Sequence, residues 1–416
     1  MSLSTFIKNK KILNGLLFLI LLIVLISESK IDSDFSIFIS ASKDLIAKKD
    51  IYSIKYKEWY HYYYDGFFAC LLIPLTFLHL AIGKFIWISF NTLLLFRIYK
   101  LIRKWLPFEN TNSKIKQLFS FIILLFAIRF IRDNIHLGQI TIFILYLIIE
   151  GLYQILFKNK LLGSLLLSLG ITIKIMPLVF IPYLLYRSEW KSILYVLAGI
   201  IFILFLPGFF IGFEYNLELI NSRLQLINPL NDEHILDNSE RSFHSITTFL
   251  TVLLYPHCTD IHILPIKRNI ADISIEHLNL IISIARLFFA MITLYFLNSL
   301  PFKKSNSKEQ SFYEISYLLI AIPLIFPHQQ HYAFLLILPG IYYCVRYFLL
   351  NYSNLSFVKK FIYCSSLILI FFIISSPFIL GTFSEYYDHF KTLTYGTFIL
   401  ILVLAFSRPK VQIISN

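Results

Sequence analysis

Charged residues are scarce in this sequence. Asp, Glu, Lys and Arg make up 15% of the 416 residues, whereas a soluble domain usually carries about 25%. Apolar residues account for 57% of the chain, and the mean hydropathy is +0.72. A composition this apolar excludes an ordinary water-soluble globular protein, and it also excludes an intrinsically disordered chain.

Cysteines are few, and nucleotide-binding motifs are missing. The four cysteines are never spaced as C-x-x-C, so neither a disulfide framework nor a cysteine-based zinc site is indicated. The sequence has no G-x-x-x-x-G-K-[ST] loop and no G-x-G-x-x-G turn, which argues against use of a nucleotide. Internal repeats and Pro-rich linkers are also missing, so we expect residues 1–416 to form one membrane domain.

What the sequence has in abundance is long apolar runs, rich in its 42 Phe and 26 Tyr. A membrane span takes roughly 20 residues, so the runs predict an all-α polytopic membrane protein with about twelve transmembrane helices. The first run follows a basic start and lacks a cleavage site, so it is interpreted as a retained span. Two runs, 67–82 and 243–256, are interpreted as partial, re-entrant or interfacial segments. The expected spans are 12–26, 85–101, 117–131, 139–157, 161–173, 176–187, 191–212, 273–299, 313–326, 332–350, 361–380 and 390–407.

The basic residues favour this topology. The formal net charge is +13, from 37 basic and 24 acidic residues. With both termini in the cytoplasm, more than half of the basic residues fall in short inner connections, as the positive-inside rule requires. They include Arg187 and those of the stretch 97–116. The positive charge is therefore interpreted as topology charge and not as a nucleic-acid-binding surface.

Polar residues of other kinds gather on the predicted outer face. This face receives the loop 28–66 with its seven carboxylates, the stretches 129–139, 214–242 and 328–331, and Lys174. Ionisable groups near membrane depth are costly to keep and are functional candidates by default. The outer face is therefore where we expect an active site.

Asp34 stands directly before an expected helix in the first outer loop. Ile37, Ala41, Leu45 and Ile46 recur with helical spacing, which predicts an amphipathic helix on the membrane surface. Asp34 is then either the N-cap of this helix or a catalytic base, and the two roles are compatible.

Several motifs follow one another along the chain. The first outer loop has Asp34-Phe35, Ala41 and a terminal Asp50-Ile51-Tyr52. Later motifs are Leu137-Gly138-Gln139, Gly170 with Lys174 and Pro177, Arg187 with Trp190, Glu240-Arg241-Ser242, and Phe326-Pro327-His328 with His331. In order and spacing these pieces resemble glycosyltransferase family 87, the polyprenyl-phosphate-mannose-dependent mannosyltransferases of the GT-C membrane superfamily.

The resemblance implies a GT-C-type fold and an inverting glycosyltransferase. Such an enzyme moves a hexose, mannose in this family, from a polyprenyl-phosphate donor to a lipid or glycan acceptor at the outer face. Asp34 matches the family's first-loop aspartate and is the expected general base. Asp32 is the fallback, and its alternative role is a solvated loop charge.

Other polar residues are candidates for binding the donor. The departing phosphate needs cations, and Arg and Lys suit this task in different ways. The candidates are Lys174, Arg129, Arg132 and Arg241. Alternatively, Lys174 is an ordinary lysine at the membrane boundary, and Arg129 and Arg132 extend from the ends of spans toward water. The alternative for Arg241 is an ion pair with Glu240. Gln139 is a candidate for sugar binding, or it satisfies backbone groups at a helix start. His328 and His331 are candidates for contacting the donor phosphate or the acceptor hydroxyl, or they are simply hydrogen-bonded.

No cofactor and no required metal are expected. His328 and His331 are spaced i, i+3, but the sequence shows no third ligand beside them. Asp133 and Glu240 are expected to form structural ion pairs, and Glu150 has no assigned role. The expected partners are a polyprenyl-phosphate sugar donor, a lipid or glycan acceptor and membrane lipids, with no nucleic acid.

The expected location is the plasma membrane of a bacterium, with the active site on the periplasmic or extracellular side. Two other functions stay open. One is a transporter or flippase of polyprenyl-linked glycans, although such proteins tend to show repeats and midplane charges. The other is an envelope polysaccharide polymerase or ligase.

Overall fold

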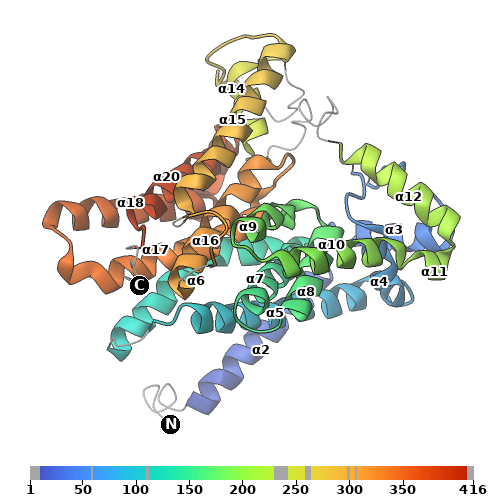
Figure 1. Cartoon of the computed structure of the whole chain (residues 1–416), viewed down its shortest axis with the longest axis horizontal. Coiled ribbons are helices and arrows are strands. Elements are labelled where there is room, and N and C mark those ends of the chain that lie inside the picture. Colours follow the sequence, from blue (N-terminus) through green and yellow to red (C-terminus); the bar gives the residue numbers. More distant parts are fainter. Residues whose placement is uncertain are drawn as a thin grey trace.

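The structure is a computed structural model of the whole chain (Figure 1). It describes residues 10–57, 60–108, 112–228, 242–257, 264–297, 300–304 and 307–409. Every regular element in these ranges is a helix, and the only β pairing described is two isolated bridges. The prediction of an all-α fold is confirmed.

The first half of the chain supplies eleven helices to the described residues. They are α2 (Lys10–Ser29), α3 (Phe35–Ile46), α4 (Gly66–Thr76), α5 (Leu80–Trp105), α6 (Ser113–Leu137), α7 (Thr141–Phe157), α8 (Lys160–Ile173), α9 (Phe180–Tyr186), α10 (Trp190–Phe205), α11 (Gly208–Ile211) and α12 (Phe213–Leu226). A 3-10 turn, Met176–Val179, stands between α8 and α9. The stretch 214–226, expected in an outer loop, is thus helical.

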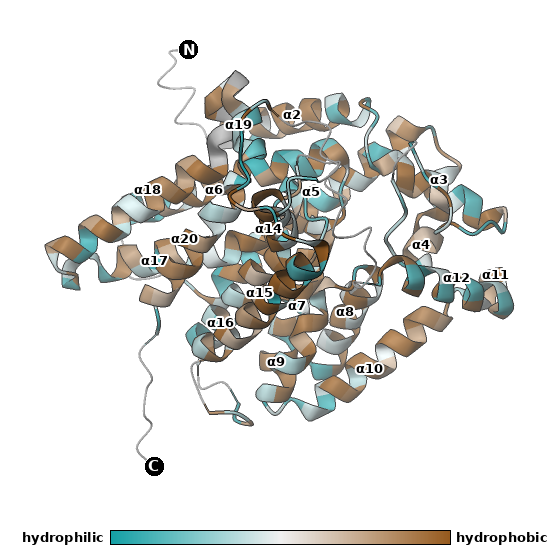
Figure 2. Cartoon of the chain, turned by 90° about the horizontal axis from the view of Figure 1, so that it is seen from above, coloured by the Kyte–Doolittle hydropathy of each residue, from teal (hydrophilic) through white to brown (hydrophobic). Residues whose placement is uncertain are grey.

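The second half adds seven helices to the described residues. They are α14 (Ile246–Leu254), α15 (Ile275–Phe296), α16 (Lys308–Ile325), α17 (Leu338–Asn351), α18 (Phe357–Leu380), α19 (Ser384–His389) and α20 (Thr392–Phe406). A 3-10 segment, His331–Ile337, leads into α17. Both views place α3, α4, α11 and α12 together at one end of the molecule and α17 and α18 at the other (Figures 1 and 2).

Six stretches are long and apolar enough to cross a membrane: Ile12–Ser29, Leu80–Trp105, Trp190–Ile211, Ile275–Phe296, His331–Asn354 and Phe357–Ile374. Only 11% of the first stretch and 22% of the last are buried in the protein. Figure 2 shows that α2, α10 and α18 are predominantly apolar along their length. Apolar side chains left uncovered on long helices suit contact with lipid tails, so the chain is an integral membrane protein.

The two runs interpreted as partial segments form short helices. α4 has 11 residues and α14 has 9. At 1.5 Å per residue they rise about 16 Å and about 14 Å, against a hydrocarbon core of about 30 Å. Neither helix can cross the bilayer alone, which agrees with their interpretation as partial segments.

Two basic residues assigned to topology charge prove to be structural. Arg187 at the end of α9 is fully buried, and its Nε donates to Glu314 Oε2 of α16 at 3.0 Å. Arg97 of α5 pairs with Glu150 of α7 at 3.1 Å. No role could be assigned to Glu150 from local patterns, because its partner lies 53 residues away in the chain. Each pair joins two apolar helices, where an unpartnered charge is costly.

Candidate active site

The first outer loop meets the junction of α6 and α7 at one hydrogen bond. Gln139 Nε2 donates to Asp34 Oδ2 at 2.6 Å. Tyr64 donates its hydroxyl to Gln139 Oε1 at 3.2 Å. The amide of Gln139 therefore has one end on the carboxylate and the other on the phenol, which fixes its orientation.

Gly138 explains why this junction is possible. It ends α6 with a left-handed backbone, φ +65°, and Gln139 N–H bonds back to Asn134 O at 2.9 Å. This is the helix ending that glycine favours. A Cβ on Gly138 would lie 2.8 Å from the Cβ of Phe35, so only glycine lets the chain pass beside Phe35. The Leu-Gly-Gln motif thus stops a helix, admits α3 and presents Gln139 to Asp34.

Asp34 does not act as a helix cap. It stands at the N-cap position of α3, but its side chain makes no capping hydrogen bond. The N-cap interpretation is therefore wrong, and the carboxylate is directed to Gln139 instead. Gln139 likewise does not cap α7, whose N-cap position is Ile140. The predicted helix after Asp34 is confirmed as α3, although most of it is buried against the protein, and Ile46 is 50% exposed.

Asp32 has a different environment from Asp34. Its carboxylate is 65% exposed and pairs with the Lys57 ammonium at 3.1 Å. Burial alone would raise the pKa of Asp32, but hydrogen bonds from Ser36 and Lys57 bring it below its usual value. Asp34, in contrast, is half-buried at the Gln139 contact. The geometry thus favours Asp34 over Asp32 as the carboxylate that faces a bound substrate.

Lys174 lies near the ring of Tyr64. Helix α8 ends at Ile173, Lys174 is extended, and Pro177 opens the 3-10 turn that follows. Its ammonium is 5.8 Å from the ring centroids of both Tyr64 and Tyr332. Among the described residues it has no anionic partner, and burial lowers its pKa to about 8. A desolvated cation of this kind would gain strongly from a bound phosphate.

Three residues that the sequence did not single out hold this region together. Lys84 of α5 is fully buried and donates to Ile31 O at 2.9 Å and to His136 O at 2.7 Å. Trp87 donates to Gly138 O at 2.8 Å. Arg223 of α12 donates to Asp65 at 2.7 Å and to Thr172 O at 2.8 Å. These contacts join the loop 28–66 to the end of α6 and to the end of α8.

A second polar cluster contains His331, the residue that precedes Tyr332 in the sequence. His331 Nε2 is 2.9 Å from Asp388 Oδ1 and 2.8 Å from His244 Nε2, and His244 Nε2 is 3.5 Å from Asp388 Oδ1. Burial lowers the pKa of His244 well below its usual value. Burial would raise the pKa of Asp388, but hydrogen bonds with both histidines hold it far below its usual range. Asp388 and His244 were missed because no spacing in the sequence links them to His331.

The remaining candidates are less central. Arg129 is 2% exposed and donates to Tyr387 Oη at 2.8 Å, and it pairs with Asp133 at 3.9 Å. It does not snorkel, and the expected ion pair of Asp133 is confirmed. Arg132 is exposed on α6. The His328 ring packs 5.1 Å from Phe243. Arg241 and Glu240 lie outside the described residues.

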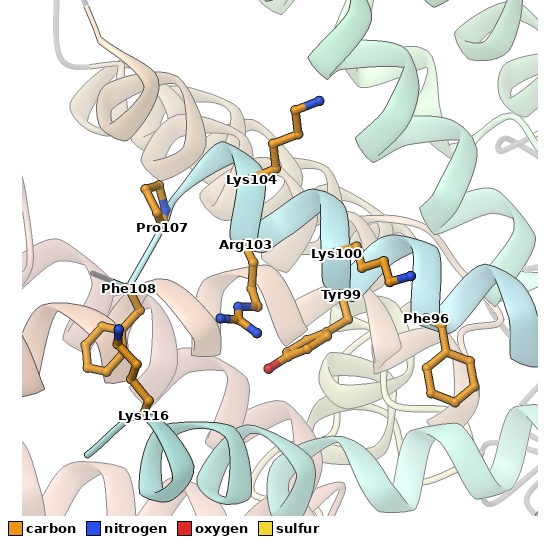
Figure 3. Close-up of a pocket in the computed structure, with 8 residues that line it drawn as sticks. All are labelled: Phe96, Tyr99, Lys100, Arg103, Lys104, Pro107, Phe108 and Lys116. Atoms are coloured by element: carbon orange, nitrogen blue, oxygen red, sulfur yellow. The ribbon is translucent and has the colours of Figure 1, made fainter. Parts of the chain in front are cut away.

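A large cavity is separate from this site. It measures about 670 Å³ and lies between α5 and α6 at the predicted inner face, where Tyr99 and Arg103 point from α5 toward α6 (Figure 3). Arg103 lies over the Tyr99 ring at 5.6 Å. The cavity contains neither Asp34 nor Lys174, so its cationic lining does not belong to the candidate active site.

Comparison with known proteins agrees with the predicted resemblance. Residues 62–254 match the sequence profile of glycosyltransferase family 87. Tyr64, Gln139 and Lys174 lie inside the matched range, whereas Asp34 and His331 lie outside it. No curated protein matches the chain. Residues 62–254, just under half of the chain, are therefore similar to glycosyltransferase family 87, which is consistent with a membrane glycosyltransferase of the GT-C type.

Proposed function

We propose that this protein moves a hexose from a polyprenyl-phosphate donor to a lipid or glycan acceptor, and that the hexose is mannose. The contact that carries the proposal is Gln139 to Asp34 at 2.6 Å, with the Lys174 ammonium 5.8 Å from the centre of the Tyr64 ring. Tyr64 links the two groups: its hydroxyl donates to Gln139, which holds the Asp34 carboxylate, and its ring lies 5.8 Å from the Lys174 ammonium. Transfer of a sugar from a lipid phosphate needs these two groups.

The chemistry follows from the two charges. The acceptor hydroxyl gives its proton to the Asp34 carboxylate as its oxygen forms a bond to the anomeric carbon. The bond from that carbon to the phosphate oxygen breaks, and the polyprenyl phosphate leaves with the electron pair. Lys174 faces the charge that develops on this oxygen. A single displacement with one carboxylate inverts the anomeric configuration, whereas retaining hydrolases use a second carboxylate as nucleophile.

An apolar cavity supports a lipid-linked donor. It measures about 430 Å³ and is bordered by α2, α5, α6, α7 and α17. Its lining reaches from Tyr342 and Ser120 to Ile131 and Leu145, near the ends of α6 and α7 that meet at Gln139. A cavity this apolar suits the isoprenoid chain of the donor, because its walls offer almost no polar contacts.

The proposal includes a membrane orientation. With twelve spans and both termini in the cytoplasm, Asp34 and Lys174 lie at the outer face of a bacterial plasma membrane. The segments assigned to that face contact one another through Asp34, Gln139, Tyr64 and Lys174. The convergence of these segments is what the orientation requires.

The test is transfer of a labelled sugar by the purified chain in lipid vesicles. We expect Asp34→Asn to lower the rate by about 10²- to 10⁴-fold, the usual contribution of a general base. Asp44→Asn is the matched control, since this α3 carboxylate pairs with Lys49 at 2.9 Å and lies away from Gln139. The control should retain the wild-type rate.

Two results would overturn the proposal. Transfer by Asp34→Asn at the wild-type rate would remove Asp34 as the base, and a rate lost in Asp32→Asn instead would assign the role to Asp32. Movement of a polyprenyl-linked glycan across the vesicle membrane by the wild type, without any transfer, would favour the flippase function. Folding of each variant is checked by its thermal denaturation curve.

A further inference from the structure

The cluster of His244, His331 and Asp388 turns three atoms of the kind that bind metal ions toward one another. Its three facing atoms, two Nε2 and one Oδ1, are 2.8, 2.9 and 3.5 Å apart. A neutral imidazole nitrogen is either a donor or an acceptor, and a carboxylate oxygen only accepts. If His331 Nε2 carries the proton, this one N–H is shared between His244 Nε2 and Asp388 Oδ1, and no proton lies between those two acceptors. If both carry one, two N–H groups face each other.

A cation at the centre of the triangle would satisfy all three atoms together. Bonds of about 2.0–2.1 Å in tetrahedral geometry put neighbouring ligand atoms about 3.4 Å apart. The observed separations reach that spacing with small outward shifts of the two imidazoles. Two imidazoles and one carboxylate are the ligand types that zinc and related first-row divalent ions take.

We infer that His244, His331 and Asp388 form a binding site for one divalent transition-metal ion of the zinc class, with a further coordination position for water or a ligand oxygen. Their ligand atoms all lie within 4.8 Å of one another. Three protein ligands are typical of zinc sites that keep one position open. His331 and Asp388 retain side-chain exposures of 18% and 15%, so water can reach the site.

The three ligands are held in place by contacts that do not involve a metal. The backbone N–H of His244 donates to the backbone oxygen of Gln329 at 2.9 Å. The Thr394 hydroxyl donates to the backbone oxygen of His244 at 2.7 Å. The Tyr387 ring packs 5.8 Å from His244 and 6.3 Å from His331. The site is thus built from three segments far apart in sequence before any ion binds.

The surrounding charges are balanced. The positive charge of Arg129 lowers the pKa of His331, and that of Lys391 lowers the pKa of His244. The carboxylate of Asp388 raises both pKa values, and that of Asp133 raises the pKa of His331. Arg129 is itself engaged with Tyr387 and Asp133. The two cations and two anions cancel, so the cluster does not repel a divalent ion.

The position of the site links it to the transferase reaction, and this link rests on the proposed function. His331 precedes Tyr332, whose ring Lys174 contacts at 5.8 Å. A metal held by His331 would add positive charge beside the region in which Lys174 faces the departing phosphate. Phosphate oxygens are ligands that an open position of this kind accepts.

The test is zinc binding by the full chain in detergent, without a polyhistidine tag and without any sugar donor. The protein is stripped with EDTA, loaded with ZnCl₂ and desalted, and the zinc per chain is measured by mass spectrometry. We expect one tightly held zinc per wild-type chain. Asp388→Asn and His244→Gln should weaken zinc binding at least about 100-fold, more than the loss of an outer-shell group.

His79→Gln is the matched control, because this exposed histidine accepts only the N–H of Ala81 among the described residues. It should bind zinc as the wild type does. Wild-type protein that holds no zinc, or folded triad variants that hold it equally well, would overturn the inference. If the variants do not fold, the visible spectrum of the Co²⁺-loaded wild type decides: tetrahedral bands displaced by zinc support the site, and their absence rejects it. Neither readout uses transfer, so failure of the metal site and failure of the proposed function are separate results.

Discussion

At the scale of single residues, Lys174 combines partial burial with the lack of an anionic partner among the described residues. Its ammonium lies 5.8 Å from the ring centres of Tyr64 and Tyr332, and desolvation lowers its pKa to about 8. An aromatic face contributes modestly to a cation's stability, roughly 0.5–2 kcal/mol. The protein thus keeps a cation in a position that costs stability, which is expected where a ligand supplies the opposite charge.

Replacing Lys174 separates stability from binding. We expect Lys174→Met to bind a short-chain polyprenyl phosphate about 10- to 100-fold more weakly, since a charge-assisted hydrogen bond contributes roughly 1.5–3 kcal/mol. The same variant should unfold at an equal or higher temperature, because it removes a half-buried charge that desolvation disfavours. Equilibrium binding and thermal denaturation check the two expectations. A variant that binds normally would contradict the assignment.

The lowered pKa of Lys174 also predicts a pH dependence. Its value of about 8 is below the usual 10.5, so between these values the unfolded chain holds more protons and this group makes stability rise with pH. Binding of the phosphate needs the charged form, so affinity should fall as the pH rises past about 8. Lys174→Arg, which stays charged, should remove this decline. Wild-type affinity that is flat from pH 7 to 10 would refute the prediction.

At the scale of elements, α7 and α8 pack with their backbones in contact. A Cβ on Gly163 of α8 would lie 2.5 Å from Gly151 O and 2.6 Å from Ile155 N, both backbone atoms of α7. Small residues allow such close approach between membrane helices. Since α7 begins beside Gln139 and α8 ends at Lys174, this packing fixes the separation of two candidate donor-binding groups.

Gly163→Ala tests that packing. The added methyl must push α7 and α8 apart, which should destabilise the protein by about 1–3 kcal/mol. Thermal denaturation in detergent measures the effect. The matched control is Gly15→Ala in α2, where a Cβ would meet nothing within 4 Å. Equal melting temperatures for the two variants would show that the helices are not in the close contact described.

At the scale of the whole molecule, polar residues from distant segments meet at one region while the long helices present apolar surfaces. The site joins the loop 28–66, the ends of α6 and α8, and the start of the segment His331–Ile337. On the predicted inner side, the charges of Arg187 and Glu314 are paired within the protein. Paired charges thus join elements on both predicted faces, and the candidate substrate-binding groups gather on the predicted outer one.

Cysteine labelling tests the orientation of the two faces. In a chain with its native cysteines replaced by serine, Lys49→Cys in the first loop should react with a membrane-impermeant maleimide in intact cells. Lys304→Cys, also at an exposed position, should react only after the membrane is opened. These results follow if the loop 28–66 is outside and the stretch 303–308 is inside. The reverse pattern would place the candidate site at the cytoplasmic face.

Much of this arrangement could be predicted from local patterns. The helix after Asp34, the helix start at Pro177 and the pair of Arg129 with Asp133 depend on neighbours within a few residues. The N-cap interpretation of Asp34 was wrong, because the amide of Gln139, 105 residues away, binds the carboxylate instead. A rule based on neighbouring residues cannot include a hydrogen-bond partner that only the tertiary fold brings close.

The sequence by itself determined the class of molecule, because scarcity of charge and long apolar runs act locally and additively through the solvent. It also determined the family resemblance, through motifs that are contiguous in the chain. Only the tertiary structure decided which polar groups meet. Asp388 contacts His331 across 57 residues of sequence, and His244 contacts His331 across 87. Lys174 lies over the ring of Tyr64, which is also far from it in the sequence. Such meetings depend on how helices pack, and packing is a property of the whole chain.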